Sequence, residues 1–157
     1  MKRLTASIAV TLLCAVVLAA QAKPNFVGKW VPTDPSAAQG MGGLGSLATV
    51  AQDDKTFKVT SVVAQMGEIT TAYNLDGSEG KSNLDFNGTA IERTTRLKWD
   101  GNKLILTAVS SFQGAAFETT QTWTLDASGN LVVELTRPDF QGGGAPVTTK
   151  ATYKKQT

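Results

Sequence analysis

The sequence predicts an all-β protein: an antiparallel up-and-down β-barrel of about 8–10 strands with little helix. After the first 22 residues, short segments alternate apolar with polar residues and are rich in Thr, Val, Leu and aromatic side chains. This pattern is typical of strands with one covered face. Helical periodicity is almost absent, and turn-forming residues separate the segments at regular intervals. A long meander of this kind most readily removes its exposed edges by closing into a barrel.

The alternation predicts ten strands. In chain order they are Asn25–Val31, Ser46–Gln52, Thr56–Ala64, Glu68–Leu75, Gly80–Asp85, Thr89–Trp99, Lys103–Ser111, Ala115–Leu125, Leu131–Arg137 and Pro146–Lys154. Four turn aspartates recur at intervals of 23, 24 and 26 residues, about the length of two strands with their turns. These are Asp53, Asp76, Asp100 and Asp126. Aspartate caps its own backbone, so tight antiparallel hairpins are expected.

Two glycine- and proline-rich segments do not fit the strand pattern. Pro32–Gly45 is expected to be a mobile flap beside an open barrel mouth, with a short helical turn as its only regular structure. Pro138–Pro146 is expected to link the last two strands as a flexible loop. Neither has the spacing of a phosphate-binding P-loop.

The first 22 residues are expected to be a secretory signal peptide. Lys2 and Arg3 precede a short apolar run, and Ala20-Gln21-Ala22 places small residues before the predicted cleavage at Lys23. An uncleaved membrane anchor is the alternative. A lipoprotein cut before Cys14 would need small residues where Leu12 and Leu13 stand. We therefore expect the mature protein to be exported to the periplasm or the extracellular space, with no stable membrane insertion after cleavage.

Residues 23–157 are expected to form a single domain, because about 135 residues bury one core but are too few for two ordinary ones. Without Lys2 and Arg3 the basic residues number 13, equal to the 13 acidic ones. This balance predicts no nucleic-acid partner. The predicted mature chain has neither His nor Cys, which excludes imidazole and thiolate catalysis and the usual zinc sites. No enzyme activity, metal or cofactor is predicted.

The start of the predicted domain resembles a known superfamily. Phe26-Val27-Gly28-Lys29-Trp30 is similar to the Phe-x-Gly-x-Trp opening of the calycins, which include the lipocalins and the fatty-acid-binding proteins. Together with the turn Trp99-Asp100-Gly101-Asn102-Lys103-Leu104, it looks closest to small secreted bacterial lipocalin-like proteins of uncharacterised function. The resemblance implies a barrel whose first tryptophan packs across one end.

Two departures limit this resemblance. Ten strands suit the fatty-acid-binding type, but the glycine-rich Pro32–Gly45 stands where that type has a helical lid. That type also has an Arg-x-Tyr pair in its last strand, whereas this chain has Ala151-Thr152-Tyr153. Only Tyr153 matches, so the resemblance does not imply fatty-acid specificity.

Alternation places several polar side chains on the inward faces of the strands, since residues i and i+2 share a face. Arg93, Tyr73, Gln121 and Tyr153 are the predicted ligand contacts. An inward Arg93 would suit an anionic head group, because a guanidinium presents a planar fork. The alternative is that Arg93 pairs with an internal carboxylate or reaches the rim.

The sequence therefore predicts a non-catalytic binding protein for a small, largely apolar or amphipathic ligand. The alternative is an envelope structural or protein-interaction module whose barrel is filled by side chains; its protein partner is unknown. A lumen of about 300 Å³ or more would favour the ligand-binding hypothesis.

Overall fold

The computed structural model describes residues 23–38, 43–64, 66–86, 88–112, 114–139 and 142–157. The predicted signal peptide and Cys14 lie outside the described residues, so its cleavage stays a prediction. Within the described part of the chain no helix is present, and hence none that is long and apolar enough to cross a membrane.

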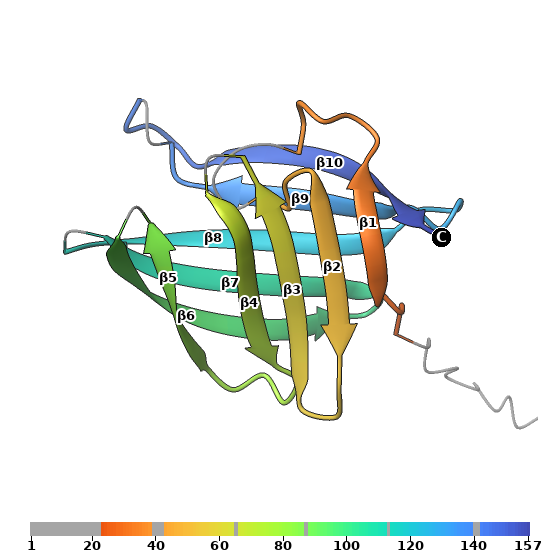
Figure 1. Ribbon diagram of the computed structural model, residues 1–157, viewed down its shortest axis with the longest axis horizontal. Helices are drawn as coiled ribbons and strands as arrows, with labels where there is room; N and C mark the ends of the chain where they lie inside the picture. The colour runs from red at the N-terminus through yellow and green to blue at the C-terminus, as the bar shows by residue number, and fades with distance from the viewer. Residues whose placement is uncertain (1–22, 39–42, 65, 87, 113, 140–141) are drawn as a thin grey trace, which may run out of the picture.

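Ten antiparallel strands form one sheet that curls into a nearly closed barrel (Figure 1). The strands are β1 (Gly28–Pro32), β2 (Leu47–Gln52), β3 (Thr56–Val63), β4 (Gly67–Asn74), β5 (Gly80–Phe86), β6 (Thr89–Asp100), β7 (Lys103–Phe112), β8 (Ala115–Leu125), β9 (Leu131–Arg137) and β10 (Val147–Gln156). Their order in the sheet is β4-β3-β2-β1-β10-β9-β8-β7-β6-β5. The predicted all-β barrel is confirmed, and β1 pairs with β10 as well as with β2.

Three of the four aspartate turns join laddered hairpins as predicted: Asp53 between β2 and β3, Asp100 between β6 and β7, and Asp126 between β8 and β9. The hairpin predicted at Asp76 is wrong, because no backbone ladder joins β4 to β5 in the described residues. Asp53 Oδ1 accepts hydrogen bonds from the backbone N–H groups of Lys55 (2.8 Å) and Thr56 (2.7 Å). Asp126 Oδ1 does the same for Ser128 (2.8 Å) and Asn130 (2.9 Å). Because the Asp53 and Asp126 carboxylates accept hydrogen bonds from backbone N–H groups within their own turns, they stabilise these two hairpins.

The first strand begins later than predicted, at Gly28 rather than Asn25. Phe26 leaves the strand path to enter the core, where it is 1% exposed, and its carbonyl accepts a 2.8 Å hydrogen bond from Trp30 Nε1. In β10, alternation predicts that Val147 and Thr149 face inward, but both are exposed. Ala151 and Tyr153 are the first buried residues of β10, so the first half of this strand extends beyond the core.

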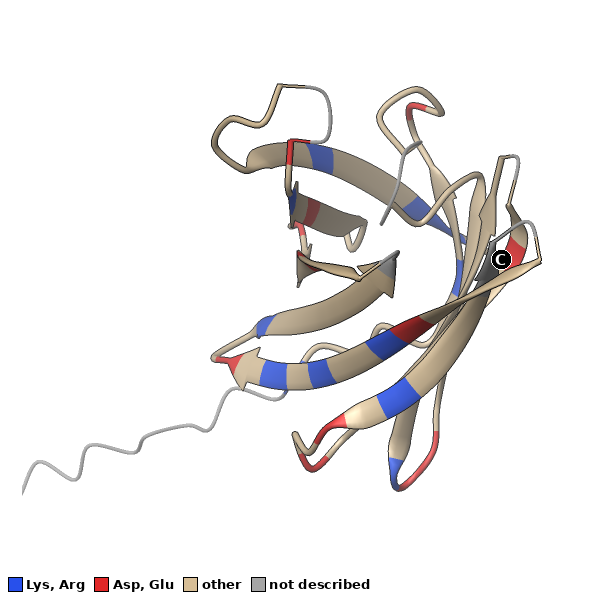
Figure 2. Ribbon diagram, turned by 90° about the vertical axis from the view of Figure 1, so that its left-hand side faces the viewer, with Lys and Arg blue, Asp and Glu red and all other residues tan. Residues whose placement is uncertain are grey.

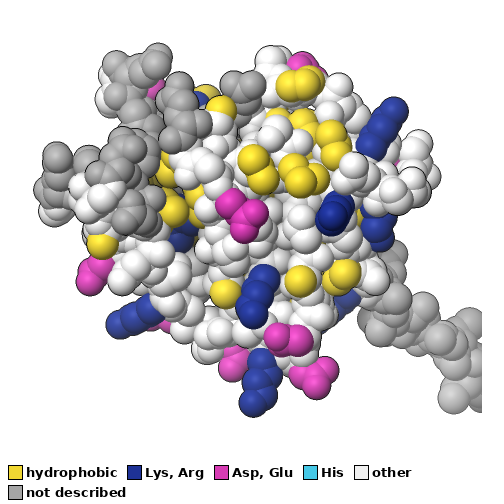
Figure 3. All heavy atoms as spheres, in the orientation of Figure 1, with side chains coloured by type: hydrophobic (Ala, Val, Ile, Leu, Met, Phe, Trp, Pro, Cys, Tyr) yellow, Lys and Arg dark blue, Asp and Glu magenta, His cyan; other side chains and the backbone are white. Residues whose placement is uncertain are grey.

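An aromatic cluster fills one half of the barrel. The Trp123 ring lies edge-on to Phe26 and Phe57, with centroids 5.7 and 5.8 Å apart, and Phe26 stacks on Trp99 at 6.1 Å. Trp30 is also fully buried, in agreement with the packing that the calycin resemblance implies. Outside, charges of both signs are interspersed along the strands and turns (Figures 2 and 3).

The described parts of the segment Pro32–Gly45 differ from the expected mobile flap. Ala38 and Leu44 are buried in the core, and the Gly45 N–H donates to the Ala38 carbonyl at 3.1 Å. The Ser46 N–H donates to the Val62 carbonyl at 2.9 Å. Both ends of the segment are therefore fastened to the barrel. Residues 33–38 form turns and bends, and residues 39–42 lie outside the described residues.

Gly45 is the tightest point of this attachment and gives a stability prediction. Its φ is +67°, and a Cβ there would lie 2.0 Å from the Val62 carbonyl oxygen. Gly45→Ala is expected to lower the free energy of unfolding by about 2–4 kcal/mol, because it adds backbone strain and displaces the bond to Ser46. Gly101 is the matched control: its φ is +58°, but a Cβ there would have nothing within 4 Å. Gly101→Ala should cost only the strain, about 1–2 kcal/mol. Equal losses in urea unfolding would contradict the role of the close contact.

Candidate functional site

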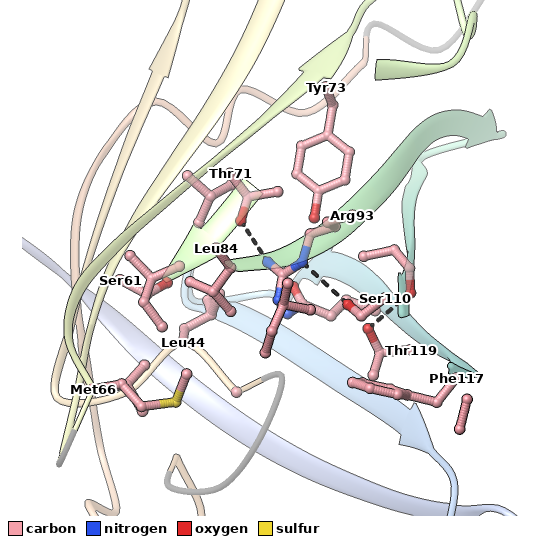
Figure 4. Close-up of a pocket in the computed structure, with 18 residues that line it drawn as sticks. Leu44, Ser61, Met66, Thr71, Tyr73, Leu84, Arg93, Ser110, Phe117 and Thr119 are labelled. Carbon is pink, nitrogen blue, oxygen red and sulfur yellow. Dashed lines mark hydrogen bonds between the residues drawn. The ribbon is translucent and has the colours of Figure 1, made fainter. Parts of the chain in front are cut away.

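The barrel holds a cavity of about 340 Å³ beyond the aromatic cluster (Figure 4). Strands β3 to β8 contribute its walls, and Gly43 and Leu44 contribute from the segment before β2. Most of the lining is apolar, including Val59, Val63, Met66, Ile69, Leu84, Ile91 and Phe117. The place of a residue along its strand decides whether it lines the cavity or belongs to the aromatic cluster. In β8, for example, Phe117 lies toward the β7–β8 turn, whereas Trp123 lies at the other end of the strand, within the aromatic cluster.

Among the described residues that line the cavity, Arg93 is the one that carries a charge. Its Nε donates to Ser110 Oγ at 3.3 Å, and its Nη1 donates to Thr71 Oγ1 at 3.0 Å. No carboxylate in the described ranges forms an ion pair with it, so the predicted alternative of an internal carboxylate partner is not found there. Burial lowers the pKa of Arg93, but a guanidinium remains charged. The wall of an apolar cavity thus carries one half-buried positive charge.

Tyr73 points its hydroxyl group toward Arg93 (Figure 4). The side chain is 6% exposed, and its hydroxyl makes no hydrogen bond with the described residues. Burial raises the pKa of Tyr73 to about 12, although the charge of Arg93 acts in the opposite direction. The phenol therefore stays protonated through the physiological range and can donate a hydrogen bond into the cavity beside the guanidinium.

Gln121 also lines the cavity, and its Oε1 accepts a 2.7 Å hydrogen bond from Trp123 Nε1. It joins the cavity to the aromatic cluster. Tyr153, by contrast, is 1% exposed in the core and is not among the lining residues. Burial raises its pKa to about 12, against the effect of a backbone hydrogen bond from Leu44. Three of the four predicted contacts thus meet in one cavity, and Tyr153 lies apart. Their roles in binding stay predictions.

Ser110 is a residue of the site that the sequence reasoning missed, although it holds the Arg93 side chain in place. Alternation along β7 places Leu104, Leu106, Ala108 and Ser110 on one inward face, and all four are buried. That pattern would have found Ser110. The contact between Thr71 and Arg93 joins two strands that are not paired by a backbone ladder, so alternation within either strand does not predict it.

The chemistry of the lining is that of a binding surface. The described lining residues supply apolar side chains, hydroxyls, one amide and one guanidinium, and no His, Cys, Asp or Glu is among them. In the part of the chain that the structure describes, no three such residues gather to hold a metal ion. The arrangement can bury an apolar group and donate hydrogen bonds to a polar one.

Comparisons with known proteins support the fold. No protein-family model and no curated protein sequence matches the chain. Among solved structures, the chain is similar to a mutant of the fluorescent protein UnaG, with a TM-score of 0.55 and 20% identity over 84% of this chain and 96% of that one. It is likewise similar to secretory abundant heat soluble protein 4 from Ramazzottius varieornatus, with a TM-score of 0.56 and 21% identity over 83% and 94%. At these identities the likeness shows the fold alone, an antiparallel β-barrel.

Proposed function

We propose that this chain is an exported, non-catalytic binding protein that carries one small, largely apolar ligand in the barrel cavity. The polar end of the ligand is anionic and lies against Arg93 and Tyr73, with Gln121 as a further contact. The apolar remainder lies against the surrounding aliphatic and aromatic walls. Residues 1–22 direct export and are removed, and residues 23–157 form the single ligand-binding domain.

The half-buried charge of Arg93 is the observation that carries this proposal. A charge in an apolar site is costly unless it is paired, and in many proteins a carboxylate supplies the partner. Here hydroxyl groups hold the guanidinium, and Nη2 makes no hydrogen bond with the described residues. An anionic ligand oxygen would supply the missing charge and accept a further bond from the Tyr73 hydroxyl.

The volume of the cavity favours ligand binding over the alternative of a side-chain-filled interaction module. About 340 Å³ lies within the range of small-molecule sites, roughly 300–1,000 Å³. A barrel that served only as a scaffold would gain stability by filling this space, because an empty cavity forfeits packing contacts. The aromatic half of the same barrel is filled in that way.

Native mass spectrometry of the protein purified gently from its exported location would test the proposal. We expect a one-to-one adduct whose mass disappears on denaturation, together with release of an amphipathic anion. The apo protein should also bind anilinonaphthalene sulfonate with one-to-one stoichiometry, and the released molecule should displace this fluorescent anion. An apo mass combined with no binding of the dye would contradict the proposed function.

A further inference from the structure

The barrel wall has one place where no backbone ladder joins neighbouring strands. The sheet order begins with β4 and ends with β5, and in the described ranges no ladder joins β4 to β5 or β6. Every other pair of neighbours in the barrel is laddered; β3 and β4, for example, pair in register from Thr56↔Asn74 to Val63↔Gly67. We call the line along which β4 meets β5 and β6 the seam.

Two side-chain hydrogen bonds from β6 fasten the seam. Thr95 Oγ1 donates to the Ala72 carbonyl at 2.8 Å, and Arg93 Nη1 donates to Thr71 Oγ1 at 3.0 Å. Thr95 is fully buried and does not line the cavity. Its hydroxyl reaches β4 by passing Gly80 at the start of β5, where an added Cβ would lie only 2.5 Å from Thr95 Oγ1. The missing side chain of Gly80 therefore leaves room for the bond.

The seam is the weakest wall of the barrel. Separating any other pair of neighbouring strands breaks a series of backbone hydrogen bonds. In the described residues, β4 is joined to β6 by two side-chain bonds, and at the end of β4 Asn74 Nδ2 donates to Ser78 Oγ (3.1 Å) and the Glu79 carbonyl (3.0 Å) just before β5. Since each hydrogen bond contributes a similar modest net stability, the wall with the fewest bonds opens most often. Some packing opposes this opening, because Tyr73 and Leu97 belong to the core on either side.

The seam also borders the cavity. Ile69 of β4, Leu84 of β5 and Ile91 of β6 line the cavity along it, and Arg93 both fastens the seam and faces the lumen. An opening at the seam would therefore expose an apolar path that ends at the guanidinium. The segment before β2 is fastened to β3 and not to the seam, since the Ser46 N–H donates to the Val62 carbonyl.

We propose that the barrel opens at the seam, that the ligand enters and leaves there, and that the bond between Thr95 and Ala72 sets how often it opens. This inference rests on the proposed function, which supplies the ligand. Because Thr95 lies outside the cavity lining, its bond acts on the rates of binding and release and leaves the affinity unchanged.

Thr95→Val tests the proposal, because it keeps the size of the side chain and removes its hydroxyl. In stopped-flow measurements with anilinonaphthalene sulfonate, we expect both the association and the dissociation rate constants to rise about fivefold. This is the factor that corresponds to the net free energy of one hydrogen bond, about 1 kcal/mol. The Kd should stay within about twofold of the wild-type value. Thr95→Ser retains the hydroxyl and should retain the wild-type rates. Gly80→Ala should raise the rates as Thr95→Val does, and adding it to Thr95→Val should raise them no further.

Thr136→Val is the matched control. Thr136 lies on the outer face of β9, where its hydroxyl bonds to that of Thr148 at 2.9 Å, and β9 and β10 are joined by a backbone ladder. This variant should not change the rates. Unchanged rates in Thr95→Val, or equal acceleration in Thr136→Val, would overturn the seam as the route.

Hydrogen exchange of the ligand-free protein separates this inference from the proposed function. The β4 amides exchange when this edge strand detaches from β3, and that movement also breaks the bond between Thr95 and Ala72. In Thr95→Val they are therefore expected to exchange about fivefold faster, by the stability of one hydrogen bond, while those of β8 and β9 keep their wild-type rates. Unchanged exchange in β4 would overturn the seam as the opening wall. If the wild-type protein bound no dye while β4 exchange still rose, the proposed function would fail and the opening of the seam would stand.

Discussion

Replacing Arg93 by leucine is expected to weaken the binding of anilinonaphthalene sulfonate at least about 30-fold. Loss of one partner of a buried, hydrogen-bonded charge pair costs about 2–5 kcal/mol. The uncharged parent of this dye, phenylnaphthylamine, has the same rings without the sulfonate and should bind within about twofold of wild type. Fluorescence titration of both dyes measures the difference. A similar loss for both would reject the anionic head-group role of Arg93.

Arg96→Leu is the control for this experiment. Arg96 lies on the same strand, three residues further along, but faces outward, is exposed, and pairs with Glu79. It should leave both affinities unchanged. Tyr73→Phe refines the result, because the hydroxyl has no partner among the described residues and its loss should leave the fold intact. We expect it to weaken sulfonate binding about fivefold, by one hydrogen bond.

Replacing Trp123 by alanine is expected to lower the free energy of unfolding by about 3–5 kcal/mol, a large fraction of the stability of a small domain. The side chain is completely buried, its ring contacts Phe26 and Phe57, and its Nε1 donates to Gln121. Alanine would leave a cavity in the aromatic cluster and remove the partner of the Gln121 oxygen. The described residues contain no cysteine, so no disulfide there supports the weakened core.

Urea unfolding followed by circular dichroism would measure this loss. Trp99→Ala is the comparison, because Trp99 is only partly buried and packs at the border of the same cluster. It should cost clearly less than Trp123→Ala. Equal costs for the two variants would contradict the view that the aromatic cluster is centred on Trp123.

Local patterns carried most of the fold prediction. Alternation depends on the two-residue period of a strand, and the turn aspartates act on their own backbone, so both can be read within a few residues of sequence. The start of β1 could not be read in this way. Phe26 leaves the alternation because the aromatic rings of β6 and β8 are present to receive it, and those rings come from distant parts of the chain.

Alternation predicts which face of the sheet a side chain occupies, but it does not predict how far along the barrel axis the side chain lies. It correctly places Arg93, Tyr73 and Gln121 inside the barrel, and the structure brings them to one cavity. Tyr153 faces the same interior but is packed in the core beyond the cavity lining. Depth depends on the stagger of all ten strands, which no single strand encodes.

The segment Pro32–Gly45 shows a second limit. Its glycines and prolines indicate the absence of regular structure, but they do not indicate whether the segment is attached. Two small or aliphatic residues within it, Ala38 and Leu44, find places in the core once the barrel has formed. Their burial is a tertiary effect that overrides the local composition.

The pairing of β1 with β10 has a consequence for the way the chain reaches its native state. The two strands lie side by side in the middle of the sheet order, and Lys29 pairs with Gln156, almost at the opposite end of the sequence. Contacts between residues so far apart in the sequence form slowly. The long loop between them must close, at a cost in chain entropy, before the contact can stabilise the structure. It also cannot form on a ribosome before Gln156 has emerged. Until then β1 offers an unpaired edge to other chains, so the last strand completes the sheet and also protects the nascent protein from aggregation.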